Sequence, residues 1–370
     1  MKILYVTTVT STINAFLVPH IEQLVQEGHQ VDVASAENQP LNPQLDQLGC
    51  QFYPIDFTRS ALSLQHTRSY RQIRQLIKER GYDVVHTHTP IASFIVRAAS
   101  RDLAVKVIYT AHGFHFHQAA SRKNRMLYYS MERLAARWTD LLITINDEDY
   151  RNSQRLPVRG HVGFTHGIGF RPGGVNQLAE DFDRETWREC YGYHERDTVL
   201  VYAAELSARK NQSRLIAVLP QLRESVKLLL LGDGPQRQDD ELLAHQLGVS
   251  NRVTFAGYQT DITPFLAMAD IAVSSSRQEG LPVNIMEALA FNLPVVATDI
   301  RGHQDLIKSG VNGFLYQTDD QLVTQIHLLL NQPAPFDPQA VQQLLANFSL
   351  ERVQRELQQL YQQVGIAGNR

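Results

Sequence analysis

Two carboxylates flank a Gly-Leu-Pro turn in the C-terminal half of the chain. Glu279 lies in the turn, and Glu287 lies about one turn into the helix predicted to follow it. A carboxylate accepts hydrogen bonds, so Glu279 can bind sugar hydroxyls and Glu287 can bind a ribose. The backbone amides near 280–283 can bind an anion or a sugar, because the first amides of a helix lack intrahelical partners. Each carboxylate taken alone is equally compatible with ordinary surface charge.

A pair of cations follows an expected strand earlier in the same half. Arg209 and Lys210 come after the strand expected at 198–203, close to the start of a helix. Positive side chains beside a helix N-terminus suit a diphosphate, although an Arg-Lys pair is also common on solvated surfaces. Gly232 and Gly234 follow the next strand, and glycines there permit close approach of the backbone to a ligand.

Histidines end two of the strands expected in the N-terminal half. His86 and His88 are alternate residues and share one face of their strand. One interpretation is a metal site, and the other is a polar wall that contacts substrate. No cysteine or HExxH spacing supports a metal, so none is predicted. His112 is the stronger candidate for a functional contact, because Gly113 beside it lets the chain turn and expose it.

The turn after the first expected strand contains hydroxyl and amide side chains but no glycine. Ser11, Thr12 and Asn14 can hydrogen-bond an acceptor substrate, or the turn can simply cap a helix. A dinucleotide-binding turn needs glycines so that the backbone can approach a pyrophosphate, so an NAD-dependent enzyme is not expected. The chain also lacks a Walker A sequence, which argues against a P-loop nucleotidase.

Strand-like and helix-like stretches alternate along the chain, a pattern typical of parallel sheets covered by helices. Strands are expected at 2–8, 31–36, 51–56, 83–87, 105–111 and 141–145, and again at 198–203, 226–231, 253–256, 270–275, 294–298 and 313–315. The first helix is expected at 13–28, and the last at 349–363 with Ser349 as its N-cap. The stretch 156–196 is rich in glycine and proline, so we expect it to join two doubly wound domains.

The composition sets limits on the class of protein. The chain has 370 residues, a net charge of -3 and two cysteines, which favours a cytoplasmic globular protein without a disulfide framework and without nucleic-acid partners. The N-terminal apolar run is too short for a signal peptide, and no run is long enough to span a bilayer. Residues 57–138 carry 14 Lys/Arg and 4 Asp/Glu, a net charge of +10. Within it, basic residues lie beside aromatic and apolar ones at 122–129, which suits a membrane surface or a pyrophosphate-bearing lipid, although an ordinary solvated face is nearly as compatible.

Together these motifs resemble the signature of family 4 glycosyltransferases. The Glu-x7-Glu spacing around Gly-Leu-Pro continues into Glu-Ala-Leu-Ala and Pro-Val-Val-Ala-Thr. Further motifs stand in the order typical of the family: the segments 83–89 and 110–113, Lys210, the Gly-Asp-Gly-Pro turn at 232–235, Gly257 and Asn312-Gly313. The resemblance covers essentially the whole chain and is strongest to bacterial enzymes that build capsular and exopolysaccharide repeat units.

The resemblance implies a GT-B fold, in which two Rossmann-like domains face a central cleft. Residues 1–165 would bind the acceptor, 166–348 would bind the nucleotide sugar, and a C-terminal helix within 349–370 would cross back to the first domain. The implied catalytic set is His112, Glu279, Lys210 and Arg209. The implied donor-binding set is Gly232, Gly234, Gly257, Gly280, Leu281, Pro282, Val283 and Glu287, and the acceptor set is Ser11, Thr12, Asn14 and His88.

The activity implied is that of a retaining, metal-independent hexosyltransferase. Its donor would be a UDP-hexose or UDP-N-acetylhexosamine, and its acceptor a polyprenyl-diphosphate-linked saccharide at the cytoplasmic face of the membrane, with no cofactor. This chain departs from the family at the first turn and at Ala204-Glu205-Leu206, where many members have Gly-Arg-Leu, so Arg209 would replace the usual arginine. A sugar-nucleotide epimerase and a catalytically inactive nucleotide-sugar-binding protein are the alternatives. The Asp-x-Asp match at Asp147 is attributed to a helix cap.

Overall fold

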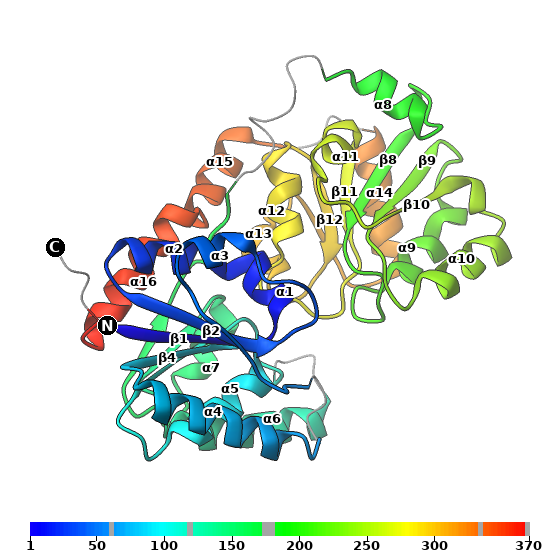
Figure 1. Cartoon of the computed structure of the whole chain (residues 1–370). Helices are drawn as coiled ribbons and strands as arrows, with labels where there is room; N and C mark the ends of the chain where they lie inside the picture. The colour runs from blue at the N-terminus through cyan, green and yellow to red at the C-terminus, as the bar shows by residue number, and fades with distance from the viewer. Residues whose placement is uncertain (59–62, 117–120, 172–181, 332–335, 367–370) are drawn as a thin grey trace. The chain divides into compact units, whose positions relative to one another are not determined.

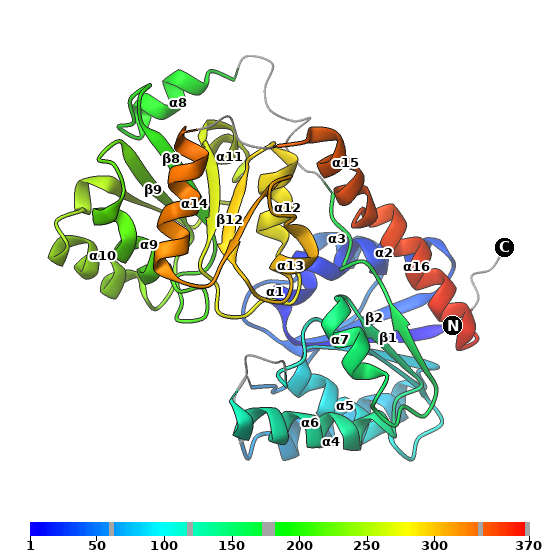
Figure 2. The same ribbon diagram turned by 180° about the vertical axis from the view of Figure 1, so that it is seen from behind.

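The chain folds into two compact units, which are described separately (Figure 1, Figure 2). The computed structural model describes residues 1–58, 63–116, 121–171, 182–331 and 336–366. The N-terminal unit comprises Met1–Gly169 and Phe348–Arg370, and the C-terminal unit comprises Phe170–Asn347. The last helix of the chain therefore belongs to the first unit.

The N-terminal unit is built on a seven-stranded parallel sheet with the order β3-β2-β1-β4-β5-β6-β7. Its strands are β1 (Lys2–Val9), β2 (Gln30–Ala36), β3 (Phe52–Pro54), β4 (Val84–His88), β5 (Lys106–Ala111), β6 (Leu141–Thr144) and β7 (His161–Phe164). Alternate residues of β1 enter different cores: Ile3 and Tyr5 pack on one face, and Leu4 and Val6 on the other. Helices thus cover both faces of the sheet, which defines a doubly wound fold.

The helices of this unit connect successive strands, except for α16, which is the last element in the described part of the chain. They are α1 (Thr10–Thr12), α2 (Val18–Gln26), α3 (Pro43–Gln47), α4 (His66–Arg80), α5 (Pro90–Ser100), α6 (Arg122–Ala136), α7 (Asp147–Ser153) and α16 (Leu350–Gln363). Helix α16 buries an apolar stripe that includes Val353, Leu357 and Leu360 in the same core as β1. Ser349 accepts a hydrogen bond from the Arg352 amide, which confirms the predicted N-cap.

The single helix expected at 13–28 is wrong in its first half. The structure has α1, then a π-helical turn η1 (Ile13–Leu17), and only then α2. Pro19 stands in the first turn of α2 and has no amide hydrogen to donate to the preceding turn. Proline therefore disfavours a regular α-helix through this position, and a π-helical turn lies between α1 and α2.

The C-terminal unit has a six-stranded parallel sheet with the order β10-β9-β8-β11-β12-β13. Its strands are β8 (Thr198–Ala203), β9 (Val226–Leu231), β10 (Val253–Gly257), β11 (Ile271–Ser274), β12 (Val295–Thr298) and β13 (Gly313–Tyr316). Its helices are α8 (Arg184–Cys190), α9 (Gln212–Val218), α10 (Arg237–Gln246), α11 (Thr263–Met268), α12 (Val283–Ala290), α13 (His303–Leu306), α14 (Asp319–Asn331) and α15 (Pro338–Asn347). The two doubly wound domains expected from the sequence are confirmed.

The stretch expected to join the domains contains more structure than its composition indicates. Strand β7 and helix α8 both lie within 156–196, and residues 172–181 of that stretch lie outside the described part of the chain. A side chain at Gly163 in β7 would approach a methyl group of Leu360 to 2.6 Å. Glycine at this position therefore lets α16 pack closely on the edge of the sheet, so here it is a packing residue within a strand.

Candidate active site

An ion pair joins two loops at the carboxyl ends of β8 and β11, the neighbouring strands where the strand order of the sheet reverses. Lys210 precedes α9, and Glu279 precedes α12. The Lys210 ammonium lies 2.5 Å from Glu279 Oε1, and the two side chains are only 12% and 8% exposed. Arg209 is more exposed, and its guanidinium lies 3.5 Å from the other carboxylate oxygen. Three of the four residues predicted to be catalytic thus meet at one point.

The Glu279 carboxylate is held in its charged form. Burial acts to raise the pKa of Glu279, but Lys210, the Ser276 hydroxyl and Arg209 together outweigh it and lower the pKa below its usual value. The carboxylate is therefore ionised at neutral pH and neutralises much of the nearby positive charge. An incoming diphosphate would meet Arg209 and a lysine with further donor hydrogens available.

Hydroxyl groups that the sequence analysis did not select support this carboxylate. Ser276 donates to Glu279 Oε1 at 2.6 Å, so the Tyr202 hydroxyl, 2.7 Å away, must donate to Ser276. Ser275 donates to the Asn211 carbonyl at 2.7 Å and so ties the two loops together. The run of three serines directly after the buried strand β11 is the sequence feature that could have identified them.

Helix α12 begins next to this ion pair. Its N-cap is Pro282, which offers no side-chain hydrogen bond to the first amides of the helix. Asn284 donates to the Ala203 carbonyl at 3.0 Å and so fixes the start of α12 to the end of β8. Glu287 is half-buried, and burial raises the pKa of its carboxyl. Val283 and Glu287 of the predicted donor-binding set therefore lie on α12, and residues 280–282 form the turn before it.

The three glycines of the predicted donor-binding set bring loops together. The Gly232 amide donates to the Gly257 carbonyl at 2.7 Å. Gly232 has φ of +141°, and a side chain there would lie 2.1 Å from the Ala204 carbonyl oxygen. Gly234 lies in the same turn, which packs against the loop that follows β8. These glycines therefore allow the carboxyl ends of β8, β9 and β10 to meet, and their contact with a donor stays a prediction.

Three histidines of the N-terminal unit form a row, in which His86 and His88 are buried and His112 is half-buried. His112 Nε2 lies 3.0 Å from His88 Nδ1, and the rings of His88 and His86 lie 4.3 Å apart. His86 in turn bonds Thr110 and Tyr361, each at 2.8 Å. The structure therefore places His88 against the ring of His112 and connects the row to helix α16 through Tyr361.

The row is uncharged at neutral pH. Burial, with a smaller electrostatic contribution from His20, lowers the pKa of His112 to about 4. Burial and the neighbouring imidazoles also lower the pKa values of His86 and His88 well below the usual value. Neutral imidazole has one donor and one acceptor nitrogen, so His112 can hydrogen-bond a sugar hydroxyl without carrying charge.

A small cavity of about 20 Å³ lies beside these rings. Its lining includes Tyr5, His20, His86, His88 and His112. The volume is sufficient for about one water molecule, since roughly 10–15 Å³ is needed. His88 Nε2 is buried without a hydrogen-bond partner among the described residues, so a water in this cavity would satisfy it.

Asp149 is a further residue that the sequence analysis missed. It is fully buried, and its carboxylate accepts hydrogen bonds from the Phe114 amide at 3.0 Å and the Asn146 amide group at 2.8 Å. It therefore holds the loop that contains His112. The cap assigned to Asp147 is wrong, because Asn146 caps α7 by accepting from the Asp149 amide. Asn146 comes directly after β6 and is itself a strong N-cap residue type.

The polar side chains of the first turn bond a neighbouring loop. The Ser11 backbone amide donates to Asn38 Oδ1 at 3.0 Å, and the Asn38 side-chain amide donates to the Ser11 hydroxyl at 3.2 Å. Asn14 donates to the Pro40 carbonyl and accepts from the Asn42 amide, both at 2.9 Å. These contacts order the loop at 38–42 beside the carboxyl end of β1. Contact of Ser11, Thr12 and Asn14 with an acceptor stays a prediction.

The described residues form neither a metal-binding cluster nor a membrane span. Among them, no group of three or more His, Cys, Asp or Glu side chains is placed to hold a metal ion. No helix within the described ranges is both long and apolar enough to cross a bilayer.

Two family descriptions match the two halves of this structure. Residues 183–343 match "Glycosyl transferases group 1", and residues 13–162 match "Glycosyl transferase 4-like domain". The chain is 38% identical over 346 residues to EpsD of Bacillus subtilis (strain 168), which carries a provisional glycosyltransferase name; the match covers 90% of this chain and 88% of EpsD. The chain therefore belongs to the group 1 glycosyltransferases, and its N-terminal domain is of the family 4-like type.

More distant relatives and solved structures agree with this assignment. The chain is 25% identical over 309 residues to the Escherichia coli UDP-Gal:alpha-D-GlcNAc-diphosphoundecaprenol alpha-1,3-galactosyltransferase, with 81% of this chain and 79% of that protein covered. The Anabaena Alr3699/HepE structure in complex with UDP and glucose superposes with a TM-score of 0.77 at 21% identity, covering 98% of this chain and 99% of the other. These similarities show that the fold is GT-B.

Proposed function

We propose that this glycosyltransferase transfers a hexose or N-acetylhexosamine from a UDP-sugar, with retention, to a lipid-linked saccharide during surface polysaccharide synthesis. The main support is the cluster of Lys210, Arg209 and Glu279 at the start of α12. Such a cluster offers cations to a diphosphate and a carboxylate to a sugar. The Escherichia coli relative is named for a UDP-sugar donor and a diphosphoundecaprenol-linked acceptor, which supports the same substrate classes here.

The proposed roles follow from the charges at the site. Arg209 and Lys210 stabilise the leaving UDP diphosphate, Glu279 and the amides of 280–283 hold the sugar, and Glu287 binds the ribose. The acceptor hydroxyl attacks the anomeric carbon on the face from which UDP leaves, and a donor phosphate oxygen takes its proton. The new glycosidic bond replaces the sugar–phosphate bond. His112 contacts the transferred sugar as a neutral hydrogen-bonding group, and no metal is needed to neutralise the diphosphate.

A thermal-shift screen tests the donor assignment. Purified protein is melted with UDP, GDP, ADP and their sugar derivatives, with and without EDTA. Stabilisation by UDP and one UDP-sugar, unchanged by EDTA, is expected, because a ligand that binds only the folded state raises its melting temperature. Stabilisation by GDP or ADP derivatives alone would overturn the UDP assignment, and loss of the UDP effect in EDTA would overturn metal independence.

Turnover then distinguishes the proposed transferase from its alternatives. Transfer is assayed with the stabilising UDP-sugar and a panel of lipid-diphosphate-linked saccharides, followed by NMR assignment of the anomeric configuration. An isomerised UDP-sugar formed without acceptor would indicate an epimerase instead. Binding without turnover across the panel would indicate a nucleotide-sugar-binding protein.

We also propose that helix α6 contacts the inner leaflet of the cytoplasmic membrane. Met126, Leu127 and Leu134 on this helix are exposed, and basic residues lie beside them. This combination suits an anionic lipid surface. The basic segment 57–138 includes 59–62 and 117–120, which lie outside the described residues. Flotation with phosphatidylglycerol vesicles should exceed flotation with phosphatidylcholine vesicles, and equal flotation with both would contradict the proposal.

A further inference from the structure

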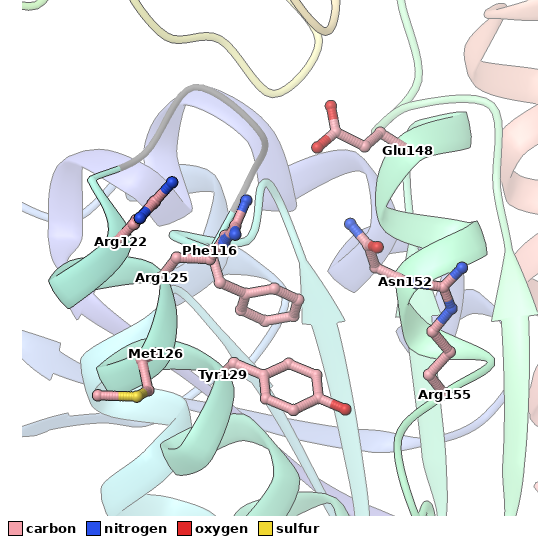
Figure 3. Close-up of a pocket in the computed structure, with 8 residues that line it drawn as sticks. All are labelled: Phe116, Arg122, Arg125, Met126, Tyr129, Glu148, Asn152 and Arg155. Atoms are coloured by element: carbon pink, nitrogen blue, oxygen red, sulfur yellow. The ribbon is translucent and has the colours of Figure 1, made fainter.

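A large basic pocket lies between helices α6 and α7 of the N-terminal unit (Figure 3). Its volume is about 600 Å³, within the range of about 300–1,000 Å³ that is usual for small-molecule sites. Its lining residues are Phe116, Arg122, Arg125, Met126, Tyr129, Glu148, Asn152 and Arg155. Arg122, Arg125, Met126 and Tyr129 belong to the basic and aromatic segment whose composition suits a pyrophosphate-bearing lipid, and Phe116, Glu148, Asn152 and Arg155 are added by the fold.

The charge of the pocket matches that of an esterified diphosphate. Three arginines and one glutamate give a net charge of +2, and a diphosphate esterified at both ends carries two negative charges. Arg122, Arg125 and Arg155 make no ion pair with a carboxylate in the described part of the chain. Their guanidinium donors therefore remain available for phosphate oxygens, which they can bind in bidentate fashion.

The pocket also has an apolar side. Phe116 is buried, its ring stacks on Phe114 at 4.6 Å, and its edge contacts Tyr129 at 5.4 Å. Met126 is 72% exposed at the same pocket. The lipid chain attached to a bound diphosphate could thus lie along the exposed apolar side of α6. An inorganic anion or a free sugar phosphate has no such chain and would leave this apolar side unused.

Two rigid connections fix the pocket within the unit. Glu132 of α6 pairs with Arg97 of α5 at 2.9 Å, and both side chains are almost completely buried. The ring of Phe114 stacks on Phe116, and its backbone amide donates a hydrogen bond to Asp149. Phe114 lies two residues after His112. The wall of the pocket is therefore continuous with the loop that contains the candidate catalytic histidine.

We propose that this pocket is the subsite for the diphosphate of a lipid-linked acceptor, with Arg122, Arg125 and Arg155 as its ligands. The proposal rests on the proposed function, since it assigns the acceptor of that reaction to one place in the N-terminal unit. Glu148 lies across the pocket from Arg122 and Arg125 in Figure 3, on the same side as Arg155, where it can accept hydrogen bonds from the saccharide that follows the diphosphate.

Titration calorimetry on the full chain tests the proposal with three probes. Farnesyl diphosphate combines both features, inorganic pyrophosphate lacks the apolar chain, and farnesol lacks the phosphates. Farnesyl diphosphate should bind at least about tenfold more tightly than either of the others, because each part contributes separately. Equal binding of pyrophosphate would overturn the lipid assignment in favour of a soluble diphosphate. Equal binding of farnesol would show that the arginines are not ligands.

Charge-matched variants locate the binding. Arg125→Gln and Arg155→Gln should each weaken farnesyl diphosphate binding about tenfold, the usual scale for losing a charged hydrogen bond. Arg133→Gln removes the same charge from an exposed position on α6 away from the pocket and should change the affinity less than about twofold. An equal loss in Arg133→Gln would indicate general surface attraction and overturn the proposal, and so would unchanged binding in both pocket variants.

A parallel UDP titration separates this proposal from the donor assignment. Wild type and the pocket variants should bind UDP equally. UDP binding without farnesyl diphosphate binding would reject the pocket proposal alone, whereas a wild-type protein that binds no UDP or UDP-sugar would reject the proposed function. Displacement of farnesyl diphosphate by UDP that depends on Arg125 would make the pocket a nucleotide site and overturn the acceptor assignment.

Discussion

The Lys210–Glu279 pair allows a double-mutant cycle that measures its electrostatic coupling. Lys210→Met removes the ammonium and retains most of the chain length, and Glu279→Gln removes the negative charge with little change of shape. The two groups lie 2.5 Å apart, with side chains 12% and 8% exposed. Removing one member of such a pair costs about 3–5 kcal/mol, because the other charge stays buried without its partner.

The remaining contacts of Glu279 set the expected size of each effect. After Lys210→Met the carboxylate keeps Ser276 and Arg209. We therefore expect this variant to lose about 3 kcal/mol of unfolding free energy, at the lower end for a buried pair. The double variant should lose about 1.5–3 kcal/mol less than the sum of the single variants, the range of a charged hydrogen bond.

Urea unfolding with a tryptophan reporter provides the assay. The chain has two tryptophans, and Trp187 belongs to the C-terminal unit, where its ring packs against Phe265 at 5.7 Å. In a Trp138→Phe background, Trp187 fluorescence therefore follows the unfolding of that unit alone. Separate reporting is needed because two domains do not have to unfold in one transition.

An exposed ion pair in the same unit is the matched control. Arg214 and Asp319 lie 2.6 Å apart, but their side chains are 23% and 53% exposed. The cycle Arg214→Met with Asp319→Asn should give a coupling of about 0.2–1 kcal/mol, as exposed pairs do. If the Lys210–Glu279 coupling is no larger than this control, burial does not strengthen the pair and the electrostatic account of the site is wrong.

Three further predictions concern the loops and the histidine row. Asp149→Asn should lower kcat about tenfold or more with little change in melting temperature, because it weakens the hydrogen bond from the Phe114 amide that holds the loop with His112. An unchanged kcat would argue against a positioning role for Asp149. Acidification from pH 7.5 to 5.0 should destabilise the N-terminal unit, because histidines whose pKa values are lowered in the folded state take up protons on unfolding once the pH falls below their unfolded pKa of about 6.5. Melting curves of His88→Gln should show a smaller loss of stability over the same pH range than those of wild type. An equal loss in both proteins would exclude the histidine row as the cause. Gly232→Ala should cost the C-terminal unit about 2–4 kcal/mol in urea unfolding, because its methyl group would lie 2.1 Å from a carbonyl oxygen, and a loss below about 1 kcal/mol would show that the loop relaxes.

The parallel sheets could be predicted because buried strands of both units are nearly continuous apolar runs. Strand β9, with four consecutive leucines at 228–231, shows this most clearly. Strand β7 was missed because it is short, lies at an edge and contains Gly163, whose role depends on contact with Leu360 about two hundred residues later. Local composition contains no information about that contact.

The site was predictable in its members but not in their pairing. Lys210 and Glu279 were found because each follows a strand, and strand ends of a parallel sheet meet at one edge. Their ion pair spans 69 residues and depends on both loops closing on the same point. Ser276 and Asp149 were missed because their significance lies in which group they bond, and that follows from the fold alone.

The hydrogen bonds of the histidine row determine which face His112 offers to a ligand. The row is neutral, so each ring has one N–H and one bare nitrogen. His88 Nε2 has no partner among the described residues, and a buried N–H without a partner is rarer in proteins than an unsatisfied acceptor. With Nε2 as the bare nitrogen, His88 would have its proton on Nδ1 and would donate to His112 Nε2. His112 must then have its own proton on Nδ1, so the group it can offer to a substrate oxygen is a hydrogen-bond donor. A neutral donor stabilises developing negative charge on oxygen without undergoing proton transfer, which fits a reaction in which a donor phosphate takes the acceptor proton.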